Sequence, residues 1–131
     1  MLKWLFLPLL LCNLATQVQA KHQLDDIKPP AQFDNIYVKP LGSNQHASEF
    51  VIFVKNAVKP HYHQHHTELV YILSGSGVMQ LNDKTIKVST GDFIRIEPGA
   101  VHSVKVTSTH PLKALSIQTP EFKGKDRIFT E

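Results

Sequence analysis

The sequence predicts an all-β domain, built as a sandwich or a barrel of short strands. Seven segments of strand length follow one another, each rich in Val, Ile, Phe or Tyr, and the breaks between them hold Gly, Pro, Asn or Asp. No segment keeps apolar residues at the i, i+3, i+4 spacing for long enough to predict a helix. Many short strands at this spacing are typical of sandwiches and barrels.

The chain before these strands divides into a leader and a polar lead-in. Residues 1–20 start with one cation, Lys3, continue as an apolar run and end in small residues that favour cleavage after Ala20, which is the pattern of a secretory signal peptide. The apolar run is too short to cross a bilayer. Residues 21–35 are polar and contain two consecutive prolines, so we expect an extended N-terminal lead-in.

Cys12 leaves lipid attachment as a second interpretation of the leader. The residue before a lipidated cysteine is usually Gly or Ala, whereas this chain has Leu11, so simple cleavage is favoured. Cleavage leaves 111 residues without a cysteine, the size of one domain. We therefore expect a periplasmic or secreted protein that has no membrane attachment after cleavage and no thiolate to offer a metal.

The predicted domain covers residues 36–119, and residues 120–131 form a C-terminal tail that is either solvated or covers one end of the barrel. Gly75-Ser76-Gly77 and Asn82-Asp83 are each expected to close a hairpin between successive strands. The predicted strands are residues 49–55, 68–74, 77–81, 84–88, 92–96, 102–106 and 113–118.

Alternation of apolar and polar residues assigns the two faces of these strands. Ile86 and Val88 are expected to point inward, with their polar neighbours facing water. His102 shares its side with Val104 and Val106, so its imidazole is also expected to point into the domain. A lone inward histidine is more often a hydrogen-bonded core residue than a metal ligand, and this alternative stays open for His102.

The segment HYHQHHTELVYILSG, residues 61–75, carries four histidines just before an apolar strand. His61 and His63 are two residues apart, which places both imidazoles on one face of an extended chain, and Glu68 begins the strand. Two imidazoles and a carboxylate that converge inside a barrel are costly to bury alone, and a divalent cation is the usual partner. A polar loop before a strand is the alternative interpretation.

Two motifs in this region resemble those of the cupin family. His61-x-His63-x4-Glu68-x6-Gly75 resembles the first cupin motif, and residues 91–102 resemble the second. The resemblance covers roughly residues 50–118. It implies a single-domain cupin barrel, which is a double-stranded β-helix or jelly roll, with one divalent transition metal (Mn, Fe, Zn, Ni or Cu) held by three histidines and a glutamate. Carried over position by position, the implied ligands are His61, His63, Glu68 and His102.

The chain departs from the family pattern at two positions that bind no metal: Glu97 stands where many members have proline, and Val106 stands where many have asparagine. A ligand frame of His63 and His65 leaves only two residues before the glutamate, which is shorter than the motif. If the strand starts early, His66 lies on the same face as Glu68, two residues later, and is expected either to support the site or to face a substrate. For both His65 and His66, the other interpretation is a solvated loop histidine. Three histidines fit no spacing and are expected at the surface: His22, His46 and His110.

The resemblance leaves the function open between two classes. A six-coordinate ion with four protein ligands keeps two open positions, so the first hypothesis is a metal-dependent isomerase, lyase or dioxygenase acting on a small polar metabolite. The second is a non-catalytic module that binds a metal or a small ligand. Four side chains are candidates to assist a reaction: Tyr62, Tyr71, Gln80 and Arg95. The stronger interpretations are core packing for Tyr71 and exposure on a strand for Gln80 and Arg95.

The charge distribution and the sheet edges indicate which partners to expect. Outside the leader, thirteen Lys and Arg stand against eleven Asp and Glu, and they are scattered, so no nucleic acid partner is expected. A small-molecule ligand or substrate is the expected partner. We also consider a homodimer, formed through residues 49–55 if that strand is an exposed sheet edge.

Overall fold

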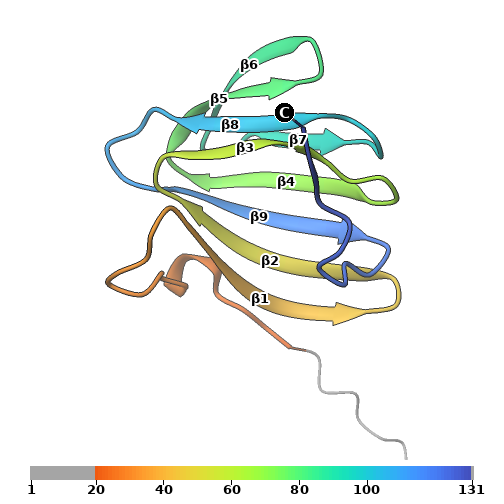
Figure 1. Cartoon of the computed structure of the whole chain (residues 1–131). Helices are drawn as coiled ribbons and strands as arrows, with labels where there is room; N and C mark the ends of the chain where they lie inside the picture. The colour runs from red at the N-terminus through yellow and green to blue at the C-terminus, as the bar shows by residue number, and fades with distance from the viewer. Residues whose placement is uncertain (1–19, 131) are drawn as a thin grey trace, which may run out of the picture.

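The computed structural model describes residues 20–130, which form two five-stranded antiparallel sheets packed face to face (Figure 1). The first sheet contains, in order, β1 (Ile36–Asn44), β2 (Ala47–Val54), β9 (Leu112–Thr119), β4 (Thr67–Ser74) and β7 (Phe93–Ile96). The second contains β10 (Ile128–Phe129), β3 (Ala57–Tyr62), β8 (His102–Val106), β5 (Ser76–Leu81) and β6 (Lys84–Ser89). The predicted all-β jelly roll is confirmed.

All seven predicted strands are present, and three further strands were missed: β1, β3 and β10. β1 contains Pro40 and Gly42, which lower strand propensity, and its pairing with β2 shifts register between them. Proline is tolerated there because β1 is an edge strand, where a missing N–H costs no ladder bond. β3 contains Pro60, and its pairing with β8 also shifts register, between Val58 and His61.

One of the two expected hairpins is wrong. β4 lies in the first sheet and β5 in the second, so the chain at Gly75 crosses between the sheets instead of reversing within one. The crossing needs a glycine, because its φ is +87° and a Cβ would lie 2.9 Å from the Cα of Leu112. The hairpin at Asn82 is confirmed, since β5 and β6 pair up to Leu81 opposite Lys84.

The strand expected as a dimer edge is not an edge. Residues 49–55 fall in β2, which pairs with β1 on one side and with β9 on the other. The terminal strands are β1 and β7 in the first sheet and β10 and β6 in the second. The error arose because β1, with its proline and glycine, was not expected as a strand.

The core lies between the two sheets. The expected faces of β6 and β8 are confirmed, since Val88 and His102 are buried while Lys87 and Lys105 are exposed. The buried apolar cluster consists of Ile72, Met79, Val88, Ile94, Ile96, Leu112 and Ala114.

Segments at both ends of the described chain pack against the sheets. A short 3-10 helix, η1 (Leu24–Asp26), approaches β9, where the Lys113 ammonium donates a hydrogen bond to the Leu24 carbonyl. At the other end, the C-terminal segment (dark blue in Figure 1) runs back across the strands and ends as β10 against β3. Among residues 20–130, no helix is long and apolar enough to span a membrane. The predicted leader, residues 1–20, lies outside the described residues except for Ala20.

Candidate metal centre

Four buried side chains converge at one end of the space between the sheets. His61 on β3 pairs directly with His102 on β8, His63 follows β3, and Glu68 projects from β4 of the opposite sheet. Their ligand atoms all lie within 4.8 Å of one another. The four residues are between 2% and 6% exposed. The structure therefore brings together the four residues that the cupin resemblance singled out, and they could hold a metal ion.

A backbone carbonyl fixes the orientation of each imidazole. In every case the ring contacts the carbonyl through Nδ1, and since a carbonyl only accepts, Nδ1 must carry the proton. When the ring is neutral, its Nε2 atom carries a lone pair, which is directed at the centre of the cluster. The partners of His61, His102 and His63 are the carbonyls of Lys59 at 2.8 Å, Ala100 at 2.9 Å and Asp126.

In this arrangement, hydrogen-bond acceptors (the Nε2 atoms and the Glu68 carboxylate) face one another unless a cation lies between them. Oε2 of Glu68 is 3.2 Å from Nε2 of His63 and 3.2 Å from Nε2 of His102. The Nε2 atom of His102 is buried and has no partner with hydrogen-bond geometry. Buried polar atoms without partners are destabilising, and three imidazole nitrogens with one carboxylate oxygen are a donor set suited to a divalent transition metal. The residues fit such an ion.

The protonation states of Glu68 and His61 favour metal binding, whereas a metal must displace a proton that His63 holds more readily than usual. Burial alone would raise the pKa of Glu68, but the imidazoles of His102 and His63 and the Ser116 hydroxyl, 2.5 Å from Oε1, hold that pKa well below its usual range. Burial lowers the pKa of His61 to about 4, so this ring is neutral near pH 7. Burial also acts against a charged His63, yet its bonds to Glu68 and to the Asp126 carbonyl outweigh burial and raise its pKa.

The C-terminal segment completes the surroundings of His63. The Asp126 carboxylate accepts hydrogen bonds from the backbone N–H groups of Gln64 and His65, both at 2.8 Å, and from Nδ1 of His66. These bonds outweigh the effect of burial and lower the pKa of Asp126 to about 2. The carbonyl of the same residue accepts from His63. Asp126 therefore connects the C-terminal segment both to the predicted ligand His63 and to the loop that follows it.

The structure distinguishes the remaining loop histidines. His66 is 8% exposed, lies outside the four-residue cluster, and contacts the Phe122 ring at a centroid distance of 5.4 Å. His65 is exposed and is held by its backbone N–H, so the shifted frame of His63 and His65 does not form. The roles of Asp126 and Phe122 were not identified from sequence. The apolar pair 128–129 in the charged tail is compatible with a short strand, and this was the one sequence signal that the tail packs against the domain.

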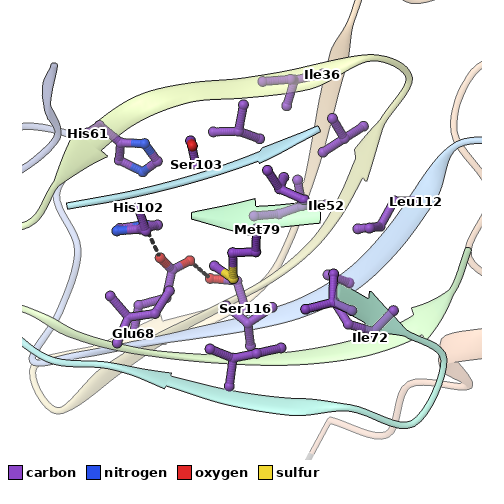
Figure 2. A pocket seen from close by; sticks show the side chains of 18 of the residues that line it. Ile36, Ile52, His61, Glu68, Ile72, Met79, His102, Ser103, Leu112 and Ser116 are labelled. Carbon is purple, nitrogen blue, oxygen red and sulfur yellow. Dashed lines mark hydrogen bonds and ion pairs between the residues drawn. The ribbon is translucent and has the colours of Figure 1, made fainter. Parts of the chain in front are cut away.

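A cavity of about 100 Å³ leads to the cluster, with His61, Glu68 and His102 in its wall (Figure 2). The four candidate assisting side chains do not line it: Tyr62, Tyr71, Gln80 and Arg95. Tyr71 is 41% exposed on the outer face of its sheet, and Arg95 forms an exposed ion pair with Glu97. Three polar residues that sequence reasoning did not select line the cavity instead: Ser103, Ser116 and Arg127.

Comparison with known proteins decides the family. Residues 49–118 match the family described as Cupin domain. The chain belongs to the cupin family. This cupin is 34% identical over 98 residues to an uncharacterized protein of Aquifex aeolicus, covering 75% of this chain and 80% of that protein. It is 35% identical over 60 residues to the quercetin 2,3-dioxygenase of Bacillus subtilis, covering 46% of this chain and 18% of the dioxygenase.

A solved structure agrees with this fold. A conserved protein with a double-stranded β-helix domain from Klebsiella pneumoniae superposes on the cupin with a TM-score of 0.72. The match covers 86% of this chain and 98% of the other at 16% sequence identity, so it supports the fold and no finer statement.

Proposed function

We propose that this cupin is an exported, metal-dependent enzyme that acts on a small molecule carrying a polar, metal-binding group. The observation that supports it is the convergence of three Nε2 lone pairs and one carboxylate oxygen at the end of a cavity. The proposed ligands of a single Mn, Fe, Zn, Ni or Cu ion are His61, His63, Glu68 and His102. When bound, such an ion supplies a Lewis acid that can polarise a substrate oxygen.

The chain itself orients the ligands and shapes access to them. His61, Glu68 and His102 line the cavity, whereas His63 does not, so a molecule in the cavity approaches the site from the side opposite His63. The Ser116 hydroxyl holds one oxygen of Glu68 and leaves the other directed at the imidazoles. The apolar wall excludes bulk water from the reacting end. Isomerase, lyase and dioxygenase chemistry are all compatible with this arrangement, and the dioxygenase relative supports an enzyme.

One observation favours the second candidate function, a non-catalytic binding module. Among the residues that line the cavity, Arg127 is the only titratable side chain apart from the predicted ligands. An acid or base for catalysis would therefore have to be Arg127, a ligand, or a metal-bound group. A protein that binds its metal and a small ligand yet turns over no substrate in a broad screen would support the module.

The metal site is tested by metal content. Protein purified from the compartment to which the cell delivers it should carry one equivalent of a transition metal, and a His63→Ala, His102→Ala double variant should carry almost none. A His46→Ala, His110→Ala variant is the matched control, because both of these histidines are exposed and outside the cluster. If wild type and the His63, His102 variant hold the same substoichiometric metal, the proposed centre is wrong. A turnover screen on the loaded protein then separates enzyme from module.

Export is tested separately. Expression of the full chain followed by fractionation and N-terminal sequencing should find a protein outside the cytoplasm that begins at Lys21, since the leader favours cleavage after Ala20. A product that stays in the cytoplasm with its leader intact would remove this part of the proposal and leave the metal site untouched.

A further inference from the structure

The cavity wall is aliphatic almost throughout. Fourteen of the twenty residues that line it have apolar side chains, drawn from both sheets. Ile52, Ile72 and Leu112 are among them, and Figure 2 shows these side chains on the side of the cavity away from the imidazoles. The sequence led us to expect a small polar metabolite, but such a wall offers contacts to carbon and few hydrogen bonds.

The polar groups of the cavity gather at the predicted metal site. Three of the six are predicted ligands, and a fourth, Ser116, already donates its hydroxyl to Glu68. The remaining two are the Ser103 hydroxyl and the Arg127 guanidinium, which lies on the exposed C-terminal segment. A bound molecule can therefore find hydrogen-bond partners for polar atoms at one of its ends. Hydroxyl groups spread along its length would lose their hydrogen bonds to water and gain none from the wall.

The entrance to the cavity is apolar as well. Ile36 and Val38, on edge strand β1, line the cavity and remain 43% and 37% exposed. Because these two side chains form part of the wall and are also partly exposed, the cavity reaches the surface at β1.

We propose that the site selects small carboxylates with an aliphatic body, the carboxylate at the metal and the body along the aliphatic wall. This inference deepens the proposed function and rests on its metal centre. An anionic oxygen head suits both the divalent ion and the nearby Arg127 cation. A 150 Å³ apolar cavity accommodates benzene, so about 100 Å³ accommodates a body of about four carbon atoms. Sugars and other polyhydroxylated molecules are disfavoured.

A homologous series tests this directly on the wild-type protein loaded with Co²⁺. Acetate, propanoate, butanoate and pentanoate are titrated, and binding is followed by the visible absorption of the metal. Each added methylene should tighten binding about fourfold, as expected for burial against an apolar wall. A 4-hydroxybutanoate probe, which has as many heavy atoms as pentanoate, should bind about tenfold more weakly than pentanoate. A flat series, or equal binding of the hydroxylated acid, overturns the proposal.

Two variants locate the aliphatic body in the cavity. Val38→Phe fills the entrance and should abolish the gain from acetate to pentanoate. Val78→Phe makes the same change on the outer face of β5, since Val78 alternates with the inward Met79, and should retain the gain. If Val38→Phe keeps the full chain-length dependence, the body binds elsewhere and the proposal fails. Failure of wild type to bind Co²⁺ would refute the metal centre itself, whereas Co²⁺ binding with a flat series refutes the substrate class alone.

Discussion

Replacing Asp126 by asparagine should weaken metal binding, although this side chain is not a predicted ligand. The Asp126 carboxylate accepts three hydrogen bonds from the histidine-rich loop, and its backbone carbonyl orients His63. An asparagine keeps the size of the side chain but loses the charge and presents an N–H₂ group where one oxygen accepted. The C-terminal segment would then hold the carbonyl against His63 less firmly.

The structure gives the size of this effect. The bonds to Asp126 lower its pKa from 3.8 to about 2, which corresponds to about 2 kcal/mol at 1.36 kcal/mol per pKa unit. We take this value as an upper limit, because the segment lies at the surface and water screens part of the interaction. The same shift corresponds to at most about a sixtyfold loss of metal affinity. That is within the 10- to 100-fold range typical of groups that orient metal ligands.

The assay is Zn²⁺ affinity by competition with a chelator at pH 7, together with the melting temperature of the metal-free protein. Asp83→Asn is the matched control, since it makes the same charge change at the exposed tip between β5 and β6. Amide exchange at Gln64 and His65 should also accelerate in Asp126→Asn, because both N–H groups lose their acceptor. Equal Zn²⁺ affinities for wild type, Asp126→Asn and the control would refute the idea that the segment positions His63.

Three further outcomes are expected. Because the pKa of His63 is raised in the metal-free protein, its proton competes with the metal, so Zn²⁺ affinity should fall about tenfold per pH unit below that pKa; a steeper loss in calorimetric titrations would mean that more than one proton is displaced. Glu68→Gln should reduce Zn²⁺ affinity more than about hundredfold by removing the one anionic ligand, and unchanged stoichiometric binding in the chelator assay would contradict its role. Gly75→Ala should lower the free energy of unfolding by about 3 kcal/mol in urea denaturation, because it adds a clash to an unfavourable φ. Gly91→Ala is the control, since Gly91 has a φ of +95° and no atom lies within 4 Å of the added Cβ, and it should cost only about 1 kcal/mol. Equal losses in the two variants would show that the clash at Gly75 is relieved.

Local sequence patterns were sufficient for seven of the ten strands, whereas the ligand set came from the resemblance to the two cupin motifs. The two-residue spacing of His61 and His63 and the alternation around His102 each depend on the strand period alone. A main-chain carbonyl has no side-chain signature, however, so the contribution of Asp126 to His63, 63 positions away, left no trace in the sequence. The crossing at Gly75 was missed for a related reason, since a turn residue is required whether the chain reverses within a sheet or passes to the other one.

The cavity could not be predicted either. Alternation identifies which side chains point inward, but it does not reveal whether they meet. Ile36 and Val38 face inward from β1 and still remain partly exposed, because the strands that end the two sheets on this side do not pair. The space next to the imidazoles therefore results from the arrangement of whole sheets, which no short segment encodes.

The four predicted ligands do not belong to one sheet. Glu68 comes from the first sheet and the three imidazoles from the second and from the loop after β3. A metal held by all four would act as a cross-link between the two layers, in a chain whose single cysteine precedes residue 20. Filling the site would then stabilise the folded state in proportion to the logarithm of the free metal concentration above its dissociation constant. Resistance of the folded chain to proteolysis would thus depend on metal supply, in the way that the stability of many small domains depends on disulfides.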